Sequence, residues 1–198
     1  MTTFTEAILL VDHRLRAAKI PFAFGGALAL MFCTGEPRTT ADLDVNVFLP
    51  ASEVDLVLQA LEPDVTYDRA ARQALQRDGQ ARLWVDRTAL DLFFSTSPFH
   101  ETISSRVVTH ELWGAQLPFL GCSDLAVFKA FFNRRKDWAD LEAMVAAEMI
   151  DTEMVVEKLA EYLGDDERVS SFEALVAELA QAKNGLPGSN KRRGRSGA

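Results

Sequence analysis

Apolar and polar positions at the start of the chain follow a helical period and then break. Residues 4–18 space their apolar side chains three and four positions apart, with charged ones between them, which predicts an amphipathic helix. The apolar run 22–24 predicts a short strand, and the glycine pair Gly25-Gly26 predicts a turn. The apolar segment 27–32 then suits a second helix.

Strict alternation begins at residue 42. Leucine and valine alternate with polar or aromatic residues from Asp42 until Pro50, which closes the run. Side chains two positions apart on a strand point to the same face. Asp42 and Asp44 are therefore predicted to share one face of a strand.

Segments with helical spacing of apolar residues and segments with strand-like alternation continue to follow one another along the chain. A helix is predicted at 54–61, with Ser52 as its N-terminal cap. Strands at 81–85 and 89–94, joined by a turn at 86–88, predict a hairpin. The remaining elements are short strands near 106–109 and 116–120, a helix from its cap Ser123 through 131, and helices at 138–149, 153–163 and 171–182.

This order of elements predicts an α+β fold, with a mixed β-sheet flanked by helices and then a C-terminal helical bundle. We expect a first domain at 1–122 and a helical region at 123–183. The segment 184–198 combines glycine, serine, lysine and arginine without periodicity, so it is predicted to be a disordered basic tail.

Composition narrows the class of protein. The chain has 198 residues, 48% of them hydrophobic, which is enough to bury a core. A formal net charge of -8 argues against a protein that coats nucleic acid through bulk attraction to phosphates. No apolar run reaches the ~18 residues of a membrane span, and no basic segment of a signal peptide opens the chain. We therefore expect a cytoplasmic protein without a membrane partner.

Cysteine, histidine and tryptophan show no pattern of a metal or cofactor site. Cys33 and Cys122 lie among apolar neighbours and are predicted to be buried thiols. The histidines are expected on the surface or in polar loops, and the tryptophans in the core or at its rim: His13, His100, His110, Trp84, Trp113 and Trp138.

The carboxylates carry the chemical prediction. An isolated Asp-x-Asp is commonplace as the solvated face of a strand, but acidic residues are depleted in strands, and paired ones repel unless a cation lies between them. Asp42 and Asp44, with Asp91 from the predicted hairpin, would give an oxygen-rich site for Mg²⁺ or Mn²⁺. Glycines before a helix let backbone N–H groups approach phosphate oxygens.

The order of these motifs resembles the signature of the DNA polymerase β-like nucleotidyltransferase superfamily: Gly25-Gly26, then Arg38-x-Thr40-x-Asp42-Leu43-Asp44. A later cluster, Lys129 with Arg134-Arg135-Lys136-Asp137 and Asp140, is similar to that of AbiEii-type toxins of bacterial toxin–antitoxin pairs, including the mycobacterial group that modifies tRNA. The resemblance covers residues 22–145.

The resemblance implies a metal-dependent nucleotidyltransferase whose catalytic domain is 1–122. The toxins transfer NMP from an NTP to RNA, so the expected substrates are a pyrimidine NTP such as CTP and the 3′ end of tRNA, and the expected partner is a cognate antitoxin protein. Phosphorylation of Thr40 or Thr39 is a candidate means of silencing, because it would add negative charge beside the metal ligands.

Site residues follow from the matched positions. Asp42, Asp44 and Asp91 are expected to bind metal and, with Lys129, to be catalytic. Expected nucleotide contacts are Gly25, Gly26, Arg38, Thr40, Arg134, Lys136 and Asp140. Asp137 and Asp140 lie three positions apart on a helix, where either could pair with a neighbouring base or orient Lys129.

Two other functions stay open at this point. The acidic balance of the chain also suits nucleotidylation of a cationic small molecule such as an aminoglycoside, or of a protein hydroxyl group. The chain could also be a non-catalytic regulatory module that retains the fold.

Overall fold

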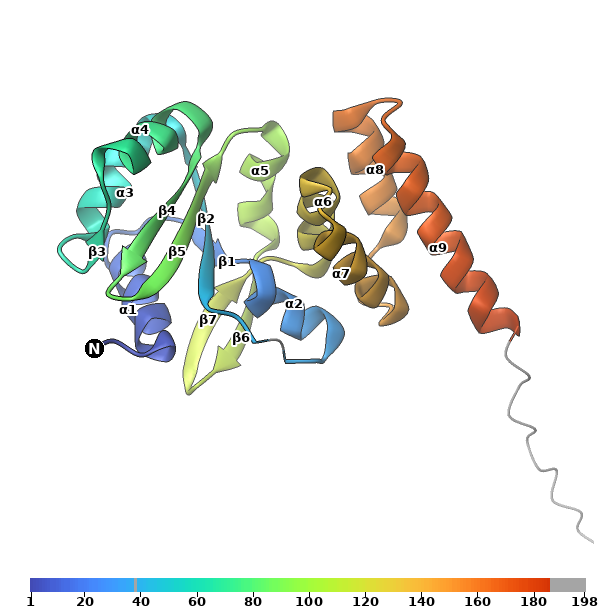
Figure 1. Cartoon of the computed structure of the whole chain (residues 1–198), viewed down its shortest axis with the longest axis horizontal. Helices are drawn as coiled ribbons and strands as arrows, with labels where there is room; N and C mark the ends of the chain where they lie inside the picture. Colours follow the sequence, from blue (N-terminus) through green and yellow to red (C-terminus); the bar gives the residue numbers. More distant parts are fainter. Residues whose placement is uncertain (38, 186–198) are drawn as a thin grey trace, which may run out of the picture.

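The computed structural model describes residues 1–37 and 39–185 of the chain. Arg38 and nearly all of the predicted basic tail, 184–198, lie outside the described residues. The predicted α+β class is confirmed, since a mixed sheet flanked by helices comes first and a group of helices follows (Figure 1).

Within the described residues, seven strands form one mixed sheet in the order β3-β4-β5-β2-β1-β7-β6. Strand β2 lies at the centre, antiparallel to β1 and parallel to β5. The strands are β1 (Phe22–Phe24), β2 (Asp42–Pro50), β3 (Val65–Thr66), β4 (Gln80–Val85), β5 (Thr88–Ser95), β6 (Val108–Leu112) and β7 (Ala115–Phe119).

The helices lie on two sides of this sheet. Figure 1 shows α1, α3 and α4 at one side and α6 to α9 together at the other. Their bounds are α1 (Phe4–Ala17), α2 (Gly26–Thr34), α3 (Val54–Leu61), α4 (Arg69–Asp78), α5 (Pro98–Thr102), α6 (Cys122–Phe132), α7 (Arg135–Ala146), α8 (Thr152–Leu163) and α9 (Glu167–Gly185), with short 3₁₀ turns at Ala51–Glu53 and Ile103–Arg106. No helix in the described part of the chain is long and apolar enough to cross a membrane.

The core explains why β2 presents its acids to one side. Leu43, Val45 and Val47 are fully buried in a continuous apolar cluster. Burying each such side chain contributes about 1.5–3 kcal/mol, so the strand cannot turn over without losing several of these contributions. The alternating positions Asp42 and Asp44 are thereby fixed on the opposite face.

Two predicted helix caps are wrong. Ser52 lies inside the 3₁₀ turn Ala51–Glu53, and α3 begins without a side-chain cap. Ser123 lies inside α6, which begins after Gly121, and its hydroxyl accepts a hydrogen bond from the backbone N–H of Asp151 at 2.9 Å instead. A serine caps a helix only at one backbone position, which the sequence pattern locates to within a few residues.

Helix α4 and strand β3 were not predicted. Helix α4 is mostly polar, with Leu75 as its buried residue and Asp68 as its N-terminal cap. It therefore lacks the broad apolar stripe on which pattern recognition depends.

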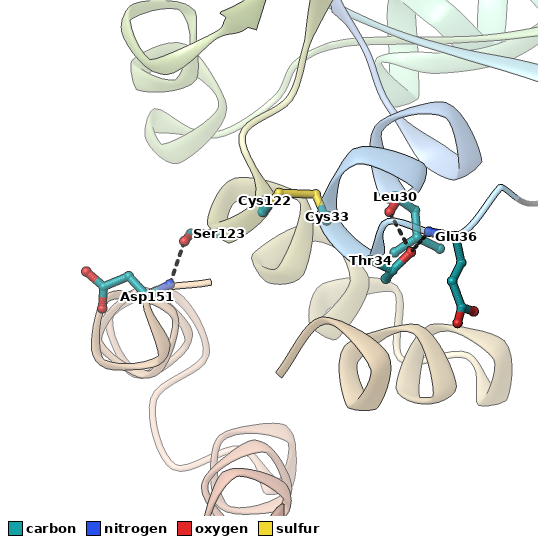
Figure 2. The surroundings of a disulfide bond; sticks show 7 residues. All are labelled: Leu30, Cys33, Thr34, Glu36, Cys122, Ser123 and Asp151. Carbon is teal, nitrogen blue, oxygen red and sulfur yellow. Dashed lines mark hydrogen bonds between the residues drawn. A yellow bond between two sulfur atoms is a disulfide. The ribbon is translucent and has the colours of Figure 1, made fainter. Parts of the chain in front are cut away.

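The prediction that Cys33 and Cys122 are separate buried thiols is wrong. They form a disulfide, with Cα atoms 5.5 Å apart (Figure 2). The two residues are 89 positions apart in the chain, and only the packing of α2 against α6 brings them together. Figure 2 also shows Ser123, next to the disulfide, hydrogen bonded to Asp151, so α2, α6 and the start of α8 are linked at this point.

His100 and two of the three tryptophans also differ from expectation. His100 is 3% exposed and packs edge-on against Phe128, at 5.1 Å between ring centroids, so its predicted surface position is wrong. Burial lowers the pKa of His100 to about 4. Trp84 and Trp113 are exposed, whereas Trp138 is partly buried and packs against the core as predicted.

Candidate functional site

The three predicted carboxylates lie together. Asp42 and Asp44 project from β2, and Asp44 is the direct neighbour of Asp91 in the parallel register of β2 and β5. All three line one polar pocket of about 670 Å³. The prediction that Asp42 and Asp44 share a face that opens into a cleft is thus confirmed, and Asp91 belongs to the same cluster.

The glycine pair is required by the close approach of α2 to Asp44. Gly26 has a φ of +52°, and a Cβ atom there would lie 1.9 Å from the Oδ2 atom of Asp44. The backbone N–H of Gly25 donates to the carbonyl of Asp44 at 2.9 Å. Gly26 lines the pocket, whereas the predicted nucleotide contact Gly25 does not. Only glycine fits at position 26, because any side chain would displace the carboxylate.

Arg82 is a member of the site that the sequence analysis missed. Its guanidinium donates two hydrogen bonds of 2.7 Å to Asp91 and one of 2.9 Å to Asp42. The side-chain hydrogen bond with Asp91 is the main reason that the pKa of Arg82 lies above its usual value. The paired fork geometry is typical of strong arginine–carboxylate contacts.

The hairpin register explains why Arg82 was missed. A turn of three residues, 86–88, was predicted, but Thr88 is already in β5 and pairs with Val85. Asp86 enables this shorter turn by adopting a φ of 53°. With two residues in the turn, Arg82 pairs directly with Asp91. The signal in the sequence that could have corrected the register is the aspartate at position 86, because aspartate tolerates the positive φ that a two-residue hairpin turn requires.

Asp44 is partly buried beside Asp91. Burial raises its pKa to about 6, and the negative charges of Asp91 and Asp42 act in the same direction, while Lys129 opposes them. A cluster of this kind is stabilised by a cation, and its all-oxygen donor set is the kind that Mg²⁺ and Mn²⁺ prefer. The residues present thus fit the predicted ion in donor chemistry.

Two of the three carboxylates, Asp42 and Asp91, are paired with Arg82 in this structure. Among the residues that the structure describes, no three histidine, cysteine or acidic side chains are already gathered as a metal-binding group. Asp42 and Asp91 are both turned to Arg82, through its Nη2 atom. Binding an ion would therefore require these carboxylates to exchange the guanidinium for the ion.

Lys129 faces the carboxylates from α6. It is 7% exposed, and its ammonium group lies 2.6 Å from Asp140 and 3.8 Å from Asp137. Both acids are buried on α7. These contacts agree with the predicted alternative in which Asp137 and Asp140 orient Lys129. Asp140 also lines the pocket.

The other predicted nucleotide contacts that the structure describes, apart from Gly25, also line this pocket. Arg134 and Lys136 line it, and Arg134 also donates to Asp137 at 2.6 Å. Thr39 and Thr40 line it from the loop before β2. The hydroxyl of Thr40 donates to the carbonyl of Asp42 at 2.9 Å, which ties this loop to the first carboxylate.

No protein-family model matches the chain, and no curated protein matches it either. Similar solved structures include that of the antibiotic-resistance factor ANT(2'')-Ia, with a TM-score of 0.46 and 16% identity, covering 93% of this chain and 96% of that one.

Two further structures are similar at the same level. An antigenic nucleotidyltransferase-like protein from Paracoccidioides brasiliensis has a TM-score of 0.49 and 13% identity, covering 91% of this chain and 88% of that one. JHP933 from Helicobacter pylori has a TM-score of 0.44 and 15% identity, covering 94% of this chain and 98% of that one. At these values we base the function on the residues of the site.

Proposed function

We propose that this chain is a metal-dependent nucleotidyltransferase. The observation that carries the proposal is the convergence of Asp42, Asp44 and Asp91 on one polar pocket, directly beside the glycine turn at Gly26. In the reaction, a hydroxyl oxygen of the acceptor forms a bond to the α-phosphorus of an NTP, the bond from that phosphorus to the bridging oxygen breaks, and pyrophosphate leaves.

The residues of the chain divide this work. Asp42, Asp44 and Asp91 would hold Mg²⁺ or Mn²⁺, which when bound supplies positive charge for the phosphates. Asp91 is also the candidate base for the proton of the acceptor hydroxyl. Lys129, Arg134 and Lys136 supply positive charge on the pocket wall for the triphosphate.

We propose RNA as the acceptor, in particular the 3′ end of tRNA, and a pyrimidine NTP such as CTP as the donor. The support is the order of motifs shared with AbiEii-type toxins, from the glycine turn to the Lys129 cluster. Modification of the tRNA 3′ end would block aminoacylation and growth. A cognate antitoxin would then be required, and Thr40, which lines the pocket, is the candidate site at which phosphate would exclude the triphosphate.

A cationic small molecule or a protein hydroxyl is the second candidate acceptor. The observation that favours a cation is the net charge of -8 together with the acids on the pocket wall. An aminoglycoside would bring several ammonium groups to such a surface. A regulatory module without catalysis would need none of these acids.

Transfer of a labelled nucleotide tests the proposal. The full chain is incubated with each labelled NTP and Mg²⁺ or Mn²⁺, in parallel with total RNA, cell protein and an aminoglycoside. Label is expected in RNA, and Asp44→Asn is expected to reduce transfer by orders of magnitude, because metal binding and positioning supply most of the catalysis.

The matched control is Asp165→Asn, which changes an exposed acid outside the pocket and should leave transfer unchanged. Label in the aminoglycoside or in protein would identify the second candidate. Absence of transfer to every acceptor, with a growth defect that Asp44→Asn does not relieve, would contradict an enzymatic function.

A further inference from the structure

A second compartment adjoins the polar pocket. It measures about 390 Å³ and shares Gly26, Asp44, Lys129 and Arg134 with the first as a common wall. Phe93 and Phe132 also line both compartments, and the second compartment adds the rings of Phe128, Phe131 and Tyr162. A ligand held at the carboxylates can therefore extend from a polar space into an aromatic one.

Phe132 has an unusual position among these rings. It is the last residue of α6. Its side chain is 43% exposed, whereas most large apolar side chains in the described part of the chain are buried. It lines both compartments. Asn133, with a φ of 54°, ends the helix directly after it and turns the chain towards α7. An aromatic ring left exposed at the junction of two compartments is a surface that a ligand can cover with a gain in free energy.

The neighbours of Phe132 give this surface a defined chemistry. The guanidinium of Arg134 lies 4.8 Å from the centre of the Phe132 ring, and the ring of Phe93 lies 6.1 Å from it. Planar π-systems stack on phenylalanine rings and on arginine guanidinium groups alike. The arrangement offers a flat heteroaromatic ring two aromatic faces and a guanidinium plane on which to stack.

We propose that the aromatic compartment is the nucleobase subsite of the donor nucleotide and that Phe132 is its stacking platform. This inference rests on the proposed function, because it assigns the base end of the same NTP. Lys129 and Arg134 line both compartments, so a triphosphate on these cations leads its nucleoside directly past Phe132. Stacking tolerates every base, so Phe132 supplies affinity and does not choose among the four NTPs.

Equilibrium binding without an acceptor isolates the contribution of the base. Calorimetry on the full chain with Mg²⁺ compares each NTP with inorganic tripolyphosphate, which has the phosphates but no base. Phe132→Ala is expected to weaken NTP binding about 5- to 150-fold and to leave tripolyphosphate binding unchanged. Phe132→Trp keeps a stacking surface and should bind NTPs within a few-fold of the wild type.

Trp113→Ala is the matched control, since Trp113 is a 51% exposed aromatic residue at the β6–β7 turn and lines neither compartment. Neither of its affinities should change. A thermal unfolding curve for each variant verifies the fold.

Three outcomes would overturn the inference while leaving the proposed function intact. Phe132→Ala could bind NTPs like the wild type, or it could lose NTP and tripolyphosphate binding equally. In a parallel titration with an acceptor oligonucleotide, it could weaken only the binding of that oligonucleotide, which would assign the ring to the acceptor. If the wild-type chain binds neither NTP nor tripolyphosphate, the proposed function fails together with the inference.

Discussion

Arg82 on β4 faces Asp91 on β5, and its guanidinium makes two hydrogen bonds of 2.7 Å to that carboxylate. A third hydrogen bond, 2.9 Å long, reaches Asp42. An arginine thus neutralises two of the three acids that we expect to bind a divalent cation, and the same oxygens cannot serve the guanidinium and the ion at full strength. Arg82 and the metal should compete.

The competition predicts that Arg82→Met binds Mn²⁺ more tightly than the wild type. Arg82 is half-exposed, so solvent weakens its ion pairs and the gain should be modest, roughly 3- to 10-fold. Free Mn²⁺, measured by electron paramagnetic resonance at fixed pH and salt, gives the affinity without any need for turnover. Arg77→Met, which removes an exposed arginine paired with Asp78 on α4, should bind Mn²⁺ as the wild type does. Equal or weaker binding by Arg82→Met would show that the arginine supports the metal site.

Gly26→Ala should abolish nucleotidyl transfer, with a small loss of stability. The new Cβ atom would collide with the carboxylate of Asp44, which has to move. The positive φ adds a strain of about 1 kcal/mol for any residue with a side chain. Gly114→Ala carries the same backbone strain at a φ of +78°, with nothing within 4 Å of its Cβ atom. Transfer rates and urea unfolding of both variants separate the two effects. The two variants should have similar stability, and only Gly26→Ala should lose transfer. Equal transfer rates in the two variants would contradict the role of Gly26.

Lys129→Met should weaken NTP binding and leave two buried acids without their shared cation. Asp137 and Asp140 both lie within 4 Å of the Lys129 ammonium group. Asp137 keeps its hydrogen bond from Arg134 in this variant, so the loss of stability should be smaller than the roughly 3–5 kcal/mol that removing one partner of a buried ion pair typically costs. Asp137→Asn and Asp140→Asn in the Lys129→Met background should recover part of that stability without restoring NTP affinity, as measured by urea unfolding and calorimetry. Lys158→Met, at a more exposed lysine on α8, is the control for loss of charge. Unchanged NTP affinity in Lys129→Met would restrict this lysine to a structural role.

His100 should make the protein less stable as the pH falls from about 6.5 to about 4. Its pKa is lowered to about 4 in the folded chain by burial, from 6.5 for an unhindered imidazole. Between these two values the unfolded chain binds the additional proton, so the free energy of unfolding decreases towards low pH and recovers above pH 6.5. This difference between the two pKa values corresponds to a change of up to about 3 kcal/mol in the free energy of unfolding.

Urea unfolding at several pH values measures the effect of His100. Because other groups also titrate in this range, the quantity to compare is the difference between the wild type and His100→Gln, which cannot titrate. That difference should change with pH between 4 and 6.5 and stay constant above it. His13→Gln, at an exposed position on α1, should follow the wild-type curve. Parallel curves for wild type and His100→Gln would contradict the assigned pKa.

The sequence predicted well whatever depends on the local period of the backbone. The alternation that begins at Asp42 determines which side chains share a face, so the position of Asp42 and Asp44 on one face followed directly. Gly25-Gly26 marked a turn because glycine is the residue that tolerates such a backbone, although the contact between Gly26 and Asp44 lay beyond that reasoning. Helices were predicted less well where few of their residues are buried, and α4, with Leu75 as its buried residue, was missed.

Residues far apart in the chain were placed by packing alone. The pairing of Arg82 with Asp91 depends on a turn of two residues, and an error of one residue was enough to hide it. The disulfide, the burial of His100 and the exposure of Phe132 depend on how α2, α5 and α6 lie against the sheet and against each other. The sequence by itself determined which acids lie side by side on one strand, since the period of two is a property of the backbone. Only the tertiary structure decided which cations and rings meet those acids, because contacts between distant segments are set by strand order and by the filling of a common core.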